Sequence, residues 1–177
     1  MHKAIWLDTI NQEKIIQFKK LTGGVSSEVY HVKTIKNNYC IKRSLKRLLV
    51  KKKWIANTNR IKFEYLWLKH CQNILKRNIP NTYEFNNKKK YIVMEYLKTS
   101  QYKTLKQLYF NKIININTIR SISKHLYKIH SSSSNYKTKK TFEGNYKNFN
   151  DLRLDPYFNE VGRVYPKYKE YIKDLNE

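Results

Sequence analysis

The chain has 177 residues, of which 40% are hydrophobic and 15 are tyrosines, and this composition argues for a folded domain and against intrinsic disorder. No apolar run approaches the roughly 20 residues that a membrane span requires. The first ten residues lack the basic and apolar regions of a signal peptide. The sequence therefore predicts a cytoplasmic protein that does not enter a membrane. Cys40 and Cys71 form no metal-ligand pattern and are expected to be small, buried thiols.

Lysine and arginine outnumber the acidic residues 37 to 13, which gives a formal net charge of +24. Such a charge would ordinarily indicate a nucleic acid or an anionic membrane as the partner. The lysines are scattered, however, and their densest runs, 51–53 and 88–90, hold three residues each. Lysine, asparagine, isoleucine and tyrosine, which share A/T-rich codons, dominate the composition. We therefore interpret the charge mainly as solvated surface and keep a basic nucleic-acid-binding protein as an alternative.

Strand signals dominate the first part of the chain. Apolar and alternating patterns predict three strands, over 14–21, 28–32 and 39–43, joined by a glycine-rich turn and by an Asn37–Asn38 turn. Apolar and aromatic residues then recur at helical spacing over 57–76, which predicts a long helix ended by the following proline. These segments form a three-stranded antiparallel meander followed by one helix.

The pattern continues with a hairpin and then with helices. Strands are expected over 82–85 and 91–97 around a lysine-rich tip, followed by helices over 104–110 and 118–130, the second capped by Asn117. A serine-rich, polar stretch beginning near residue 131 indicates an exposed connector. The expected fold class is α+β, with a five-stranded antiparallel sheet and one long helix. The expected divisions are 1–97 with a hinge at 94–97, a helical segment 98–134, a polar linker 135–147 and a helical segment 148–177.

The turn between the first two strands consists of Gly23, Gly24, Val25, Ser26 and Ser27. Glycine lets backbone N–H groups approach a phosphate that a Cβ would keep away. The turn is neither a Walker A loop nor a GxGxxG motif, and a plain hairpin turn remains the alternative. We interpret the five residues as a candidate phosphate-covering turn.

Two charged residues stand in apolar surroundings at ordered intervals after this turn. Lys42 lies within the third strand, and Glu64 lies in the middle of the long helix. Each needs a partner of opposite charge if it faces inward, because a buried unpaired charge is costly. In a kinase N-lobe the strand lysine holds the nucleotide phosphates and the helix glutamate positions that lysine. We assign these roles to the pair, with solvated surface charges as the alternative.

The last strand leads into a candidate adenine-binding segment. Met94, Glu95, Tyr96 and Leu97 end the apolar run that begins at residue 91. Backbone N–H and C=O groups at this place could orient an adenine in an apolar slot. An ordinary buried strand is the alternative.

Taken together, these segments resemble the aminoglycoside-phosphotransferase superfamily of small-molecule kinases, and in particular its methylthioribose-kinase branch. The resemblance covers about residues 17–175. It rests on the following runs: LTGGVSSEVYHV, CIKRSLKRLLVKKKW, RIKFEYLWLK, YIVMEYL, HLYKIHS and NFNDLRLDPYFNEVGRVYP. It implies a protein-kinase-like N-lobe, the start of a helical C-lobe, a helical substrate-side insertion, and ATP as the cofactor.

One motif of that family is absent from the sequence. Kinases of this type carry a loop of the form HxDxxxxN followed by a metal-binding aspartate, and no histidine here has an aspartate two residues later. We therefore expect no catalytic and no metal-binding residue in this chain. Mg²⁺ would bind only if the missing part of the C-lobe is supplied, for example by a separate chain. The expected function is the ATP-binding part of a phosphotransferase that acts on a small-molecule hydroxyl, inactive by itself. A non-catalytic scaffold is the further alternative.

The same resemblance has a consequence for the helix over 118–130. Without the rest of a C-lobe its apolar face would be covered only by the neighbouring segments. We expect exposed apolar side chains among Ile119, Ile122, Leu126 and Ile129.

Overall fold

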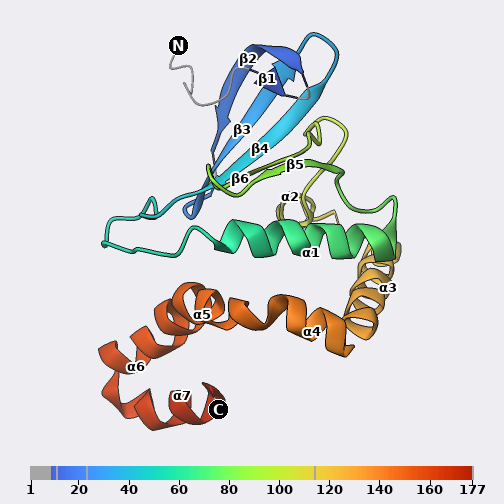
Figure 1. Cartoon of the computed structure of the whole chain (residues 1–177). Helices are drawn as coiled ribbons and strands as arrows, with labels where there is room; N and C mark the ends of the chain where they lie inside the picture. Colours follow the sequence, from blue (N-terminus) through green and yellow to red (C-terminus); the bar gives the residue numbers. More distant parts are fainter. Residues whose placement is uncertain (1–8, 11, 23, 114, 177) are drawn as a thin grey trace.

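In the computed structural model, which describes residues 9–10, 12–22, 24–113 and 115–176, a sheet, one long helix and a group of shorter helices follow one another in layers (Figure 1). The sheet lies at one end, the long helix crosses beneath it, and the chain then continues below that helix. The protein is therefore α+β, as the sequence predicts. Gly23 lies outside the described residues.

The sheet is antiparallel throughout and contains the five expected strands and one more. The additional strand is β1, only two residues long, which pairs with β2 at the edge. The spatial order is β1-β2-β3-β4-β6-β5. The strands are β1 (Thr9–Ile10), β2 (Glu13–Leu21), β3 (Ser27–Thr34), β4 (Asn38–Ser44), β5 (Thr82–Asn86) and β6 (Tyr91–Glu95).

Side chains on one face of the sheet form its hydrophobic core. Tyr39 and Ile41 of β4 point to this face because they alternate with Cys40 and Lys42. Ile10 of β1 closes the core at the edge of the sheet. The fully buried members of this cluster are Ile10, Val32, Tyr39, Ile41, Tyr91 and Val93. The opposite face of the sheet is left for the long helix.

The long helix, α1 (Arg60–Leu75), begins three residues later than expected. The side-chain oxygen of Asn57 accepts a hydrogen bond of 2.9 Å from the N–H of Asn59, so the residues from Asn57 form a turn before the helix. At the other end, Lys76 has a positive φ of 53° and donates its N–H to the carbonyl of Gln72 at 2.8 Å. The helix therefore ends where its sequence pattern predicts.

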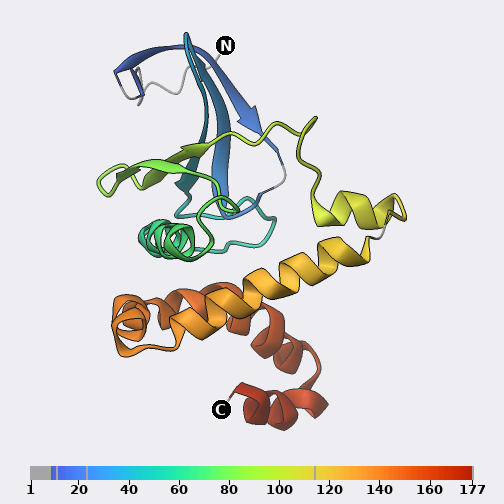
Figure 2. The ribbon, with the colours of Figure 1, turned by 90° about the vertical axis from the view of Figure 1, so that its right-hand side faces the viewer.

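Two helices connect the sheet to the lower layer. A capping box between Thr104 and Gln107 starts the short helix α2 (Leu105–Phe110). The next helix, α3 (Ile116–Ser133), starts earlier than expected, and the prediction of Asn117 as its cap is wrong. Asn115 is the cap, because its side-chain oxygen accepts hydrogen bonds from the N–H groups of Asn117 and Thr118. Figure 2 shows α3 running from α2 to the region beneath α1.

The segment 135–147, which the sequence predicts to be a polar linker, is helical. It forms α4 (Tyr136–Phe142), a 3-10 turn η1 (Glu143–Asn145) and the start of α5 (Tyr146–Phe149). Asn135 caps α4 by accepting the N–H of Thr138 at 2.9 Å. Phe142 anchors the segment by placing its ring 5.5 Å from that of Trp67. The polar composition indicated exposure correctly, but one cap and one aromatic anchor decided the conformation.

The remaining residues are helical, as expected. They form a π-helix η2 (Asn150–Asn159), α6 (Glu160–Val164), a 3-10 turn η3 (Pro166–Tyr168) and α7 (Lys169–Asn176). Gly162 of α6 is buried, and a Cβ there would lie 3.4 Å from the Cα of Lys169, so α6 and α7 approach each other closely at this position. None of the helices in the described residues is long and apolar enough to cross a membrane.

The apolar face of α3 is only partly covered. Ile129 is buried against Cys71 and Leu75 of α1. Ile119 and Leu126 are exposed, at 38% and 49% of their surface. The expected exposure therefore holds for Ile119 and Leu126 but not for Ile129, which packs against α1, and Ile122 is half-buried.

Because Ile41 is fully buried and Ile35 is 74% exposed, truncating them should have very different effects. Ile41→Ala should lower the free energy of unfolding by about 2–5 kcal/mol, because it leaves a cavity in the core. Ile35→Ala should change it by less than about 0.5 kcal/mol. Urea denaturation of the two variants measures the difference, and equal effects would contradict the assignment of the core face.

Candidate functional site

An ion pair joins the sheet to α1. The Nζ of Lys42 lies 2.6 Å from the Oε1 of Glu64. In the sheet, Lys42 lies between Val29 of β3 and Ile92 of β6, on the face opposite the hydrophobic core. About a third of each charged side chain is exposed, so the pair is open to a ligand. The predicted ion pair is confirmed.

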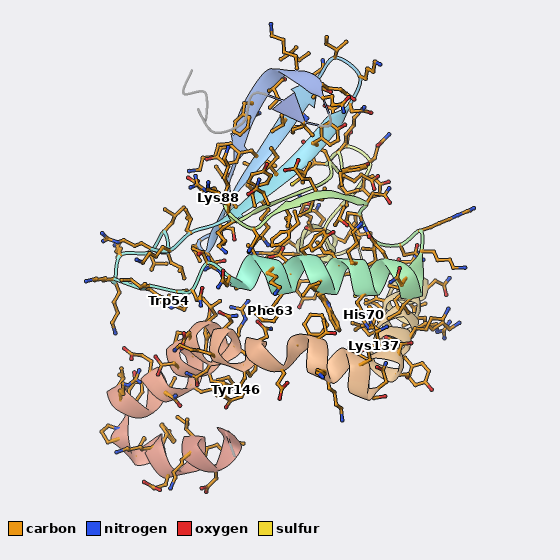
Figure 3. All side chains as sticks on the ribbon, viewed as in Figure 1. Trp54, Phe63, His70, Lys88, Lys137 and Tyr146 are labelled. Carbon is orange, nitrogen blue, oxygen red and sulfur yellow. The ribbon has the colours of Figure 1, made fainter. Side chains whose placement is uncertain are left out.

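A cavity of about 610 Å³ opens beside this pair, between α1 and the helices from α4 to η2. Figure 3 shows Phe63 and His70 beneath α1, on the side that faces α4. Four of the predicted site residues line the cavity, namely Ser26, Ser27, Lys42 and Glu64. The other lining residues are Arg60, Phe63, Trp67, Ser133, Thr138, Lys139, Phe142, Asn145, Asn148, Phe149, Leu152 and Arg153.

The predicted phosphate-covering turn is described from Gly24 onward. A Cβ built on Gly24 would meet nothing closer than the carbonyl oxygen of Ser27 at 3.5 Å, and its φ lies outside the left-handed region. Neither the backbone conformation nor the packing of the described residues therefore requires glycine at this position. Val25 does not line the cavity, and its carbonyl accepts the N–H of Leu49 at 2.8 Å. This bond holds the turn against the segment that follows β4.

Arg60 of α1 connects the turn to the helix. Its guanidinium donates to the carbonyl oxygens of Ser26, Leu45 and Asn57, the last two at 2.8 Å and 2.7 Å. Burial lowers the pKa of this guanidinium from its usual value. Sequence analysis included Arg60 only within the family resemblance. The sequence offered one signal for a role of Arg60. It is a cation in the first turn of a helix, where the helix dipole disfavours positive charge.

The predicted adenine-binding segment lies along the same sheet face but not in the cavity. Strand register pairs Cys40 with Met94 and with His31, so these residues lie next to Lys42 and Val29 on the face opposite the core. Burial raises the pKa of the Cys40 thiol to about 11, which keeps it neutral at physiological pH. Val29 and Cys40, which sequence analysis did not assign to the site, therefore extend the apolar surface that begins at Met94.

The chain leaves the sheet after Glu95, the last residue of β6. The N–H of Glu95 donates to the carbonyl of Asn81 at 2.8 Å, and its carboxylate accepts the N–H of Asn81 at 3.1 Å. The ring of Tyr96 stacks on His31, with centroids 3.8 Å apart. Within the described part of the chain, the N–H groups of Tyr96 and Leu97 have no backbone partner. The structure thus uses Glu95 to hold the end of β6 and leaves the next two amides available.

Metal ligation and similarity to known proteins add nothing to this geometry. Across the residues that the structure describes, no three His, Cys, Asp or Glu side chains come together as a potential metal site. No family model matches this sequence, and no curated protein matches it.

Replacing Arg60 should loosen the turn at Ser26. Arg60→Ala should lower the free energy of unfolding by about 1–3 kcal/mol, because the partly buried carbonyls of Ser26 and Leu45 each lose a charged donor. It should also speed amide hydrogen exchange at residues 24–27. Arg120→Ala, on the exposed surface of α3, is the control. Unchanged exchange at 24–27 would contradict the role given to Arg60.

The Lys42–Glu64 pair should contribute little to stability, because each side chain is about one third exposed. We expect a coupling free energy below about 1 kcal/mol. A double-mutant cycle with Lys42→Met and Glu64→Gln, followed by urea denaturation, measures this quantity. A coupling above about 3 kcal/mol would instead indicate that the pair is mainly structural.

Proposed function

We propose that this chain is the ATP-binding part of an ATP-dependent phosphotransferase that acts on a small-molecule hydroxyl, with residues 1–97 in the role of a kinase-like N-lobe. The observation that carries the proposal is the 2.6 Å contact between Lys42 and Glu64 across β4 and α1. It is the arrangement expected if the helix glutamate positions a phosphate-binding lysine.

The geometry around the pair supports a phosphate ligand. A lysine ammonium has three N–H donors, so Lys42 can keep its bond to Glu64 while it donates to a phosphate oxygen. Ser26 and Ser27 line the same cavity.

An apolar surface on the neighbouring part of the sheet supports binding of the nucleotide base there. Val29, Cys40 and Met94 are next to Lys42 in register and offer an apolar surface. The N–H groups of Tyr96 and Leu97 follow directly and could orient the adenine edge. Apolar contact with a few directed hydrogen bonds is typical of small-ligand sites.

Phosphate transfer itself requires groups that this sequence does not contain. The motif HxDxxxxN, which would orient the acceptor hydroxyl and bind Mg²⁺ in the family, is absent. We therefore propose that this chain binds the nucleotide. Phosphate transfer would take place in an assembly in which a C-lobe supplies those groups.

Binding of a fluorescent ATP analogue tests the proposal. Lys42→Ala should weaken ATP affinity by about tenfold, equal to about 1.4 kcal/mol, and Glu64→Gln by less, because the lysine loses only its positioning. Lys20→Ala is the matched control, since it removes a strand lysine that is ion-paired to Glu28 at 2.9 Å away from the cavity. Its ATP affinity should be unchanged.

Two results would overturn the proposal in favour of the alternatives. Absence of saturable ATP binding with an intact fold would favour a non-catalytic scaffold. Binding of single-stranded DNA that weakens steeply with salt and that ATP does not displace would favour a nucleic-acid-binding protein. Equal losses in Lys42→Ala and Lys20→Ala would show that the ion pair is not at the nucleotide site.

A further inference from the structure

The cavity beneath α1 extends well beyond the Lys42–Glu64 pair, and its far wall has a chemistry of its own. That wall is built by α4, α5 and η2, which contribute residues from Thr138 to Arg153. The nucleotide proposed above uses only the end of the cavity at Ser26, Ser27 and Lys42, and its base follows β4 and β6. The far wall under α1 is therefore not accounted for by the nucleotide.

Contacts at both ends of the cavity fix the distance between α1 and the helices below it. At one end Ile129 packs on Cys71 and Leu75, and the ring of His70 is hydrogen-bonded to Ser133 at 3.0 Å. At the other end the indole N–H of Trp54 donates to the carbonyl of Asp151 at 3.1 Å. The cavity is thus braced on two sides, which is typical of a preformed site.

Aromatic rings face each other across this space. Phe63 and Trp67 come from α1, and Phe142 and Phe149 come from the opposite wall. The ring of Phe142 lies 6.5 Å from Phe63 and 5.5 Å from Trp67, edge-on to the latter. At these distances Phe142 is in direct aromatic contact with both rings. The cluster therefore presents one apolar aromatic surface to the cavity.

The charged side chains of the lining favour an anion. The lining contains four cations, Lys42, Arg60, Lys139 and Arg153, but a single carboxylate, that of Glu64. Lys42 is paired with that carboxylate and Arg60 with backbone carbonyls. Among the described residues Lys139 has no ion pair, and Arg153 bonds only to the carbonyl of Leu152, at 2.9 Å. Two cations on the far wall are therefore available.

From these observations we infer that the cavity between α1 and the helices α4 to η2 is a binding site for a small aromatic anion, such as an aromatic carboxylate. The rings of Phe63, Trp67 and Phe142 take up the aromatic body, and Lys139 with Arg153 takes up the negative charge. A volume of about 610 Å³ accommodates such a molecule. The inference does not depend on the proposed nucleotide site.

A second cavity, of about 620 Å³ between η2, α6 and α7, provides the internal comparison. Its arginine, Arg163, is already paired with Asp155 at 2.5 Å and with Glu160 at 3.0 Å. Its two lysines, Lys169 and Lys173, share the lining with Glu170. It offers cations without facing phenylalanine or tryptophan rings.

Isothermal titration calorimetry with 2-naphthoate, neutral 2-naphthylmethanol and cationic 2-naphthylmethylamine tests the inference on the full chain. We expect 2-naphthoate to bind at least about tenfold more tightly than the amine. The double variant Lys139→Gln/Arg153→Gln should lose about tenfold in 2-naphthoate affinity and keep its affinity for 2-naphthylmethanol. Phe142→Ala should weaken both the anion and the alcohol.

The control is Lys169→Gln/Lys173→Gln, which removes the same charge from the second cavity. Its 2-naphthoate affinity should stay within about twofold of the unmodified chain. The inference is overturned if 2-naphthoate shows no saturable binding up to about 2 mM, if the amine binds equally well, or if both double variants lose the same affinity. The last result would mean that only the net charge attracts the probe.

Discussion

The alternation of side chains along β4 is the constraint on which the rest of this structure depends. Tyr39 and Ile41 enter the core of the sheet, so Cys40 and Lys42 must point to the other face. A lysine on that face needs an anionic partner, and Glu64 of α1 provides it at 2.6 Å. One strand thereby sets both the core and the position of the candidate site.

The helix α1 is shared by the two regions to which we assign ligands. Glu64 contacts Lys42 of the sheet and also lines the cavity, together with Phe63 and Trp67. Residues three and four apart share a face of a helix, so this short run brings the ion pair and the aromatic rings to one cavity. Any movement of α1 would therefore alter the ion pair and the cavity together.

Much of the fold follows from patterns in the sequence, and the differences have local physical causes. The five strands and the long helix were predictable because their apolar periodicity extends over many residues. The helix over Tyr136–Phe142 was not, because its formation depends on a cap at Asn135 and on the packing of Phe142 against Trp67. A polar composition indicates exposure and says little about backbone conformation.

The sequence by itself determined the α+β class and the alternation that places Lys42 on the face opposite Ile41, since local periodicity suffices for these. It offered the pairing of Lys42 with Glu64 as one of two interpretations, and the structure decided it. Only the tertiary structure decided that Arg60 ties the Ser26 turn to α1 and that Val29, Cys40 and Met94 share one face. It also decided that rings and cations far apart in the chain, from Phe63 to Arg153, enclose one cavity. These features depend on contacts between distant segments, and no periodicity within one segment records such contacts.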